Sequence, residues 1–113
     1  VADTWNKRVQ VFSKDFKYLR QWAVAGWPSQ SVVNKPYLAV AETPNGRRVY
    51  VTDPECYRVI VFDDQGKFIA VFGQYGNQAN EMTLPTGIAV DAQGQLFVAD
   101  PDSHRVMLFP AVN

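Results

Sequence analysis

One twelve-residue pattern occurs three times in the chain, and it constrains the fold more than any other feature of the sequence. The copies occupy residues 1–12, 51–62 and 98–109. Each copy has Val first, Asp third, Arg eighth, Val ninth and Phe last. The copies begin 50 and then 47 residues apart, a period typical of arrays of supersecondary units. The sequence therefore predicts a repeat protein rather than a globule with a single core.

The repeating unit contains four short apolar runs, which in the middle copy are residues 37–41, 49–52, 59–62 and 68–72. They are rich in β-branched and aromatic residues and are bounded by turn residues, so we predict strands. The same pattern gives three strands in the first unit and three in the last, ten in all, with no helix except a turn within 78–82. Gly46, Gly66 and Gly94 permit the positive φ that tight turns require. Residues 13–16 contain no Gly, so we expect that turn to differ or to be strained.

Two of the runs, residues 59–62 and 106–109, are apolar at every position instead of alternating, which indicates strands covered on both faces. A ring of four-stranded sheets packed face to face supplies that cover. We therefore predict an all-β chain, 1–113, that forms part of a β-propeller with four-stranded antiparallel blades. The predicted blades are 1–26 (incomplete), 36–73 (full) and 85–109 (incomplete).

Ten strands cannot close a propeller, because known rings contain at least about four blades of four strands. The outermost blades would then expose apolar faces, and exposed apolar faces mark association surfaces. We expect a second copy of the chain to complete the ring, which gives a homodimer.

Composition excludes several classes of protein. Lys plus Arg and Asp plus Glu both number 11, so the net charge is zero and the cation excess typical of nucleic-acid binding is missing. No apolar run is long enough to insert into a membrane. Cys56 is the single cysteine and His104 the single histidine, so the sequence predicts neither an internal disulfide nor a zinc site. We predict no metal site and no cofactor.

Residues 84–91 (Leu-Pro-Thr-Gly-Ile-Ala-Val-Asp), 94–100 and 104–106 resemble the NHL repeat of β-propellers. The resemblance implies blades of four antiparallel strands, most often six to a ring. The middle unit departs from the pattern, because it lacks the Gly after Pro36 and has three extra residues between Val40 and Val51. The family implies no single activity: it includes protein-interaction modules, RNA-binding domains, amidating lyases and sensor domains of bacterial membrane proteins. The last class makes an extracytoplasmic domain of a bacterial membrane-associated protein one expectation.

Six polar residues recur in every unit: Asp3, Asp53 and Asp100, with Arg8, Arg58 and Arg105. A catalytic site would need them in one unit, so repetition indicates a structural role. Each Asp and its Arg flank a tight turn between the second and third strands of a unit. We therefore expect each carboxylate to cap turn amides and to pair with its Arg.

The residues between each Asp and its Arg change from copy to copy, which suggests a surface adapted to a ligand. In a propeller these loops share one face with the connections between blades, 25–35 and 73–84, which are long for so small a unit. Their Trp, Tyr, Asn and Gln suit recognition of a protein, a peptide or a glycan. The predicted ligand-binding residues are Trp5, Asn6, Trp27, Gln30, Tyr57, Tyr75, Asn77, Asp102 and His104.

We predict a non-catalytic binding module and no catalytic residue. One alternative is a metal-assisted lyase or lactonase, in which residues such as Asp3, Asn6, Glu55 and Asp102 would converge at a central channel. Another is a purely structural scaffold. Of the tryptophans, Trp5 and Trp27 are expected on the surface, whereas Trp22, like Phe72, is expected in the core.

Overall fold

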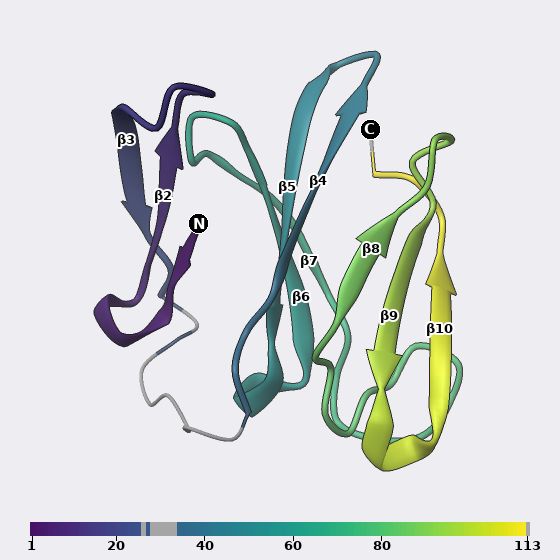
Figure 1. Cartoon of the computed structure of the whole chain (residues 1–113). Helices are drawn as coiled ribbons and strands as arrows, with labels where there is room; N and C mark the ends of the chain where they lie inside the picture. The colour runs from purple at the N-terminus through teal and green to yellow at the C-terminus, as the bar shows by residue number, and fades with distance from the viewer. Residues whose placement is uncertain (26, 28–33, 113) are drawn as a thin grey trace.

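The computed structural model describes residues 1–25, 27 and 34–112, and they form ten strands in three antiparallel sheets (Figure 1). In each sheet, strands that follow one another along the chain are neighbours. The first sheet contains β1 (Ala2–Asp3), β2 (Arg8–Phe12) and β3 (Tyr18–Ala23). The second contains β4 (Leu38–Thr43), β5 (Gly46–Asp53), β6 (Arg58–Asp63) and β7 (Phe68–Phe72). The third contains β8 (Ile88–Val90), β9 (Leu96–Asp100) and β10 (Arg105–Phe109). The ten predicted strands are confirmed.

Two apolar cores lie between the three sheets, one on each side of the second sheet. In β6, Val59 and Val61 belong to the core shared with the third sheet, while Ile60 and Phe62 belong to the core shared with the first. All four side chains are buried. The continuous apolar run in β6 therefore reflects cover on both faces, as predicted from the sequence.

The corresponding run in β10 is different. Met107 is buried against the second sheet, but Val106 and Leu108 are 68% and 58% exposed. They point away from the second sheet, because side chains alternate along a strand and the described residues place no sheet on that side. Within this chain, cover on both faces is therefore present for β6 but not for β10, whose open side is the apolar face expected of an outermost blade.

The turn between the last two strands of the first sheet shows how the chain manages without glycine. The turn of the second sheet closes with Asp63 N–H donating to Lys67 O at 2.9 Å, and Gly66 has φ +85°. The first sheet closes in the same way, Ser13 N–H donating to Lys17 O at 2.8 Å, with Phe16 at φ +63° in place of the glycine. The turn is strained rather than different, because a side chain at positive φ costs about 1–2 kcal/mol.

The three extra residues of the middle unit lengthen the hairpin between β4 and β5. β4 has six residues, whereas its counterpart β8 has three. An ion pair joins Arg47 to Glu42 across the added part of the hairpin, with 2.6 Å between the guanidinium and the carboxylate. The insertion therefore extends one strand pair and leaves the packing between the sheets in place.

Short helical turns join the second and third strands of each unit, a feature that the sequence pattern did not predict. They are the 3-10 turns η1 (Thr4–Asn6), η2 (Pro54–Cys56) and η3 (Pro101–Ser103). Each turn is followed by a left-handed residue: Lys7, Tyr57 and His104 have φ of 55°, 58° and 53°. The turn predicted within 78–82 is present, with Glu81 N–H donating to Gln78 O. Across the described parts of the chain, no helix has the length and apolar character needed to cross a membrane.

Candidate functional site: the loop face

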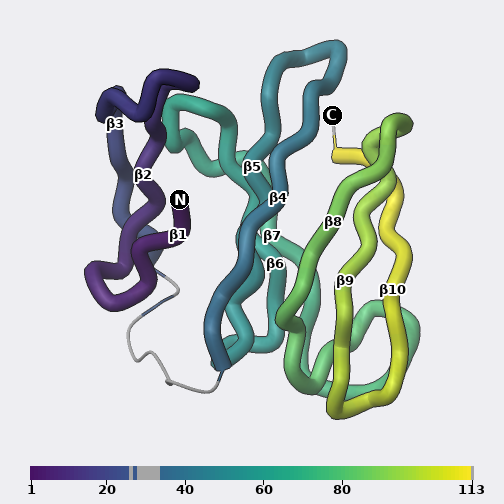
Figure 2. Tube along the Cα trace, viewed as in Figure 1, coloured from purple at the N-terminus to yellow at the C-terminus, as the bar shows by residue number. Residues whose placement is uncertain are grey.

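The antiparallel order of the strands brings η1, η2, η3 and the connection 73–87 to one edge of the molecule, here called the loop face (Figure 2). The turns β2–β3, β4–β5 and β6–β7 lie at the opposite edge (Figure 1). Trp5 is 72% exposed on the loop face, and Asn6, Asp102 and His104 are exposed beside their own turns. These four predicted ligand-binding residues are therefore available to solvent.

Tyr57 and Tyr75 meet across the junction of the second and third sheets. Tyr57 is the left-handed residue after η2, and Tyr75 belongs to the connection 73–87. Their ring centroids are 4.9 Å apart and the planes meet at 65°, an edge-to-face contact. Tyr57 is half-buried, whereas Tyr75 is 68% exposed. The contact therefore braces one exposed aromatic ring with a second, better covered one.

Trp27 corrects the prediction from sequence, which placed it on the surface. Its side chain is fully buried in the core between the first and second sheets. The indole N–H donates to the carbonyl oxygen of Thr52 at 3.3 Å, so its polar atom has a partner inside the core. Trp27 stabilises the packing of two sheets and is no part of a ligand surface. Gln30, also predicted as a ligand-binding residue, lies outside the described residues.

The predicted pairing of the recurring Asp and Arg is present in all three sheets. Arg8 Nε lies 2.8 Å from Asp3 and Arg58 Nε 2.9 Å from Asp53, and an Arg105 terminal nitrogen lies 3.5 Å from Asp100. The predicted capping is wrong, because no Asp side chain caps the 3-10 turn that follows it. Instead, the Asp3 carboxylate accepts from the side-chain amide of Asn6 within the turn, and the Asp100 carboxylate accepts from the connection 73–87.

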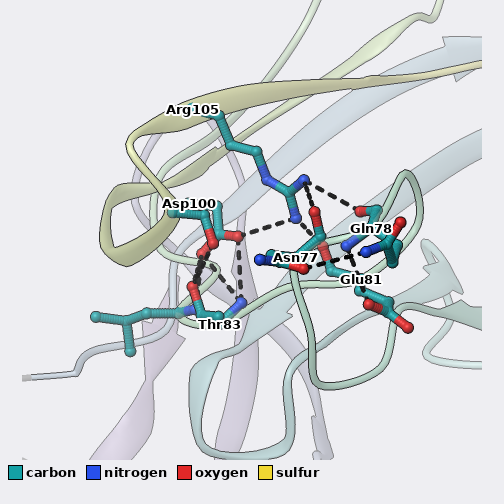
Figure 3. A network of polar contacts seen from close by, with 8 residues as sticks. Asn77, Gln78, Glu81, Thr83, Asp100 and Arg105 are labelled. Atoms are coloured by element: carbon teal, nitrogen blue, oxygen red, sulfur yellow. Dashed lines mark hydrogen bonds and ion pairs between the residues drawn. The ribbon is translucent and has the colours of Figure 1, made fainter.

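The surroundings of Asp100 form a closed set of hydrogen bonds (Figure 3). Its carboxylate accepts from the backbone N–H of Leu84 at 2.7 Å, from the N–H of Thr83 at 3.2 Å and from the hydroxyl of Thr83 at 3.0 Å. Burial would raise the pKa of Asp100, but the hydrogen bonds from Leu84 and Thr83 outweigh it and hold that pKa below its ordinary value. Asp100 therefore remains charged and ties the connection to the third sheet.

Arg105 holds the same connection from the other side of the ion pair. Its guanidinium donates to the backbone oxygens of Asn77 at 2.8 Å, Gln78 at 3.1 Å and Glu81 (Figure 3). The sequence pattern assigned Arg105 to Asp100 alone and missed this role. Between 24 and 28 residues separate the donor from these acceptors, so no local signal could have shown it. Asn77, a predicted ligand-binding residue, thus gives its carbonyl to the fold and leaves its side chain exposed.

Three features bear on a catalytic role. Among the described residues, no three His, Cys, Asp or Glu side chains gather closely enough to hold a metal ion. The residues named for the lyase or lactonase alternative lie at three separate turns: Asp3 directly before η1 and Asn6 within it, Glu55 in η2 and Asp102 in η3. Burial raises the pKa of the half-buried Cys56 thiol, and the charge of Asp53 adds to the effect. The thiol is therefore protonated at neutral pH, which disfavours a nucleophilic role.

Three antiparallel sheets packed face to face in series, with their connections on one shared edge, define a β-propeller architecture. The chain belongs to the 6-bladed beta-propeller family, whose model matches residues 42–111. The partial propeller predicted from the repeats is thereby confirmed, and the three sheets are blades 1, 2 and 3.

Two curated relatives align with almost the whole chain. It is 27% identical over 110 residues to the Drosophila melanogaster protein brain tumor, covering 96% of this chain and 10% of that protein. It is 30% identical over 109 residues to the Caenorhabditis elegans B-box type zinc finger protein ncl-1, covering 96% of this chain and 12% of that protein. The chain thus spans about a tenth of the length of these relatives.

Proposed function

We propose that the chain is a non-catalytic binding module that presents its loop face to a protein, peptide or glycan. The observation that carries the proposal is the Tyr57–Tyr75 contact, which fixes an exposed ring at the junction of two blades. Trp5, Asn6, Asp102 and His104 extend the same face with exposed aromatic, amide and acidic side chains. Aromatic and amide side chains on a rigid frame suit recognition, because little entropy is lost when they bind.

Peptide and glycan arrays probed with the 113-residue chain test this proposal. Trp5→Ala and Tyr75→Ala should each reduce binding by about tenfold or more, as expected for exposed aromatic anchors. Tyr18→Ala is the matched control, because Tyr18 is 54% exposed at the opposite edge and also makes an edge-to-face contact, with Phe12. No binder on either array, or binders indifferent to both loop-face changes, would contradict the proposal and favour a scaffold. Among the described residues, no structural observation favours the lyase or lactonase.

The second part of the proposal is that the chain associates with a second copy through the far side of blade 3. Register places Ala89, Phe97, Ala99, Val106 and Leu108 on that side. The residues of blade 2 that match Phe97, Val106 and Leu108 in the repeat are Tyr50, Val59 and Val61, and all three are fully buried beneath blade 3. The far side of blade 3 is therefore equivalent to a side of blade 2 that another blade covers. A blade from a second chain could cover it in the same way, and two chains would supply six blades.

Light scattering after gel filtration tests the association. We expect a dimer at micromolar concentration and a monomer for Leu108→Glu, with Phe16→Glu at an exposed turn as the control. The side of blade 1 turned away from blade 2 is more polar, with Gln10 and Gln21 paired where blade 2 pairs Ile60 and Val71. Gln10→Ile combined with Gln21→Val should therefore strengthen association. A folded wild-type monomer at micromolar concentration would rule out this part.

A further inference from the structure

The connection 73–87 between blades 2 and 3 is braced along its own length. Tyr75 and Met82 form a parallel bridge, in which Met82 N–H donates to Gln74 O at 2.7 Å and Gly76 N–H donates to Met82 O at 3.2 Å. Met82 is fully buried in the core between blades 2 and 3 and anchors the bridge. Residues 75–82 therefore form a loop with a fixed shape.

Several carbonyl groups of this loop and the charges beside it already have partners in the protein. Arg105 occupies the backbone oxygens of Asn77, Gln78 and Glu81, and its charge is paired with Asp100 (Figure 3). The Glu81 carboxylate accepts from Gln78 N–H at 3.0 Å and from the Gln74 side-chain amide at 3.2 Å. A ligand at this loop therefore finds the carbonyls of Asn77, Gln78 and Glu81 already occupied, and the cation beside them, Arg105, already paired.

The side chains that point to solvent from the loop are an aromatic ring and amides. Tyr75 is 68% exposed, and Gln74, Asn77, Gln78 and Asn80 are exposed around it. A peptide that binds through its backbone needs an open strand edge, and an anionic ligand needs unpaired cations. A neutral sugar needs neither, because its C–H face packs on an aromatic ring and its hydroxyls exchange hydrogen bonds with amides.

We propose that Tyr75, with the side-chain amides of Asn77 and Gln78, forms a subsite for a neutral oligosaccharide. This inference rests on the proposed loop-face function and narrows it to one class of ligand. Tyr57 holds the Tyr75 ring from the side, and Arg105 positions the amides by fixing the backbone of Asn77 and Gln78. Arg105 is thus a positioning residue that leaves the ligand untouched.

NMR titration of the 113-residue chain tests the subsite. The probes are cellohexaose, xylohexaose and mannohexaose at about 10 mM, a concentration that reveals the millimolar affinity of a single-ring subsite. We expect shifts confined to the amides of 73–83 and their neighbours with at least one neutral hexasaccharide. Polygalacturonate and a proline-rich peptide serve as the charged and peptide comparisons and should leave these amides unshifted.

Variants separate stacking from positioning. Tyr75→Phe should retain binding because stacking needs no hydroxyl, whereas Tyr75→Ala should reduce affinity at least tenfold and Tyr18→Ala should leave it unchanged. Arg105→Lys should weaken binding several-fold and also raise hydrogen exchange in 77–82, because lysine lacks the planar fork that reaches several carbonyls. Loop-face binding of a peptide alone overturns the sugar subsite and leaves the proposed function standing. If none of these probes shifts a loop-face amide, the sugar subsite is overturned. If the peptide and glycan arrays also yield no binder, the proposed function is contradicted too.

Discussion

Asp53 in blade 2 and Asp100 in blade 3 occupy the same position in the repeat, and both side chains are fully buried beside an arginine. Their other neighbours differ. Asp100 accepts three hydrogen bonds from Thr83 and Leu84, whereas Oδ1 of Asp53 has no hydrogen-bond partner among the described residues. Burial therefore raises the pKa of Asp53 against the opposing effect of Arg58, while the pKa of Asp100 is lowered. The Asp–Arg pair of blade 3 thus stabilises the protein through a fully hydrogen-bonded carboxylate. The equivalent pair of blade 2 contributes less to stability.

Removing the two charges should show the largest difference between the blades. Asp100→Asn replaces an acceptor of three hydrogen bonds by an amide whose NH₂ faces donors, and should lower the free energy of unfolding by about 2–4 kcal/mol. Asp53→Asn removes a charge that burial already penalises, and should cost at most about 1 kcal/mol. Urea unfolding at pH 7 of both variants checks the ranking, and an equal or larger cost for Asp53→Asn would overturn the comparison.

The pH dependence of stability should separate the two carboxylates by sign. Because the folded-state pKa of Asp100 is lowered, its contribution is present above about pH 4, the ordinary carboxyl value, and is lost as the pH falls through the folded-state pKa. The folded-state pKa of Asp53 is raised instead. The contribution of Asp53 to the free energy of unfolding therefore declines as the pH rises from about 4 to that folded-state pKa. Urea unfolding from pH 7 down to the lowest pH at which the chain stays folded should show the cost of Asp100→Asn shrinking. A cost that stays constant across that range would argue against the ionised carboxylate as its source.

Thr83 allows a smaller test of why Asp100 is satisfied. Thr83→Val keeps the shape but removes the hydroxyl that lies 3.0 Å from Asp100 and 2.8 Å from Ser103. We expect a loss of about 1 kcal/mol, the usual net value of one hydrogen bond. In the Asp100→Asn background the same change should cost less, because the two side chains share one set of hydrogen bonds. Thermal unfolding of the double-mutant cycle measures this coupling, and strict additivity would deny it.

Tyr50 and Phe97 provide the smallest test, since they too share a repeat position. Tyr50 is fully buried, and its hydroxyl has no hydrogen-bond partner among the described residues. Blade 3 has Phe at this position, so Tyr50→Phe should leave stability unchanged or raise it by up to about 1 kcal/mol. A clear loss of stability in urea unfolding would show that the hydroxyl has a partner, for example a buried water molecule.

Sequence reasoning succeeded where a property repeats and failed where it depends on one particular neighbour. The strands around Val59 and the turn at Gly66 recur at a fixed period, so local patterns predicted them. The burial of Trp27 did not follow from its place in a predicted connection between blades, because its partner Thr52 is 25 residues away. The role of Arg105 in the connection 73–87 was missed for the same reason.

The amino-acid sequence by itself determined the repeat, the order of the strands, the Asp–Arg frame of each blade and the edge on which the variable loops gather. These features follow from apolar periodicity and turn chemistry, which act between residues close along the chain. The tertiary structure alone decided which of two equivalent aspartates is satisfied, which tryptophan is buried and which face of blade 3 is open. Each of these depends on what another blade places against a side chain, and hydrogen bonding and burial act through distances in space rather than along the sequence.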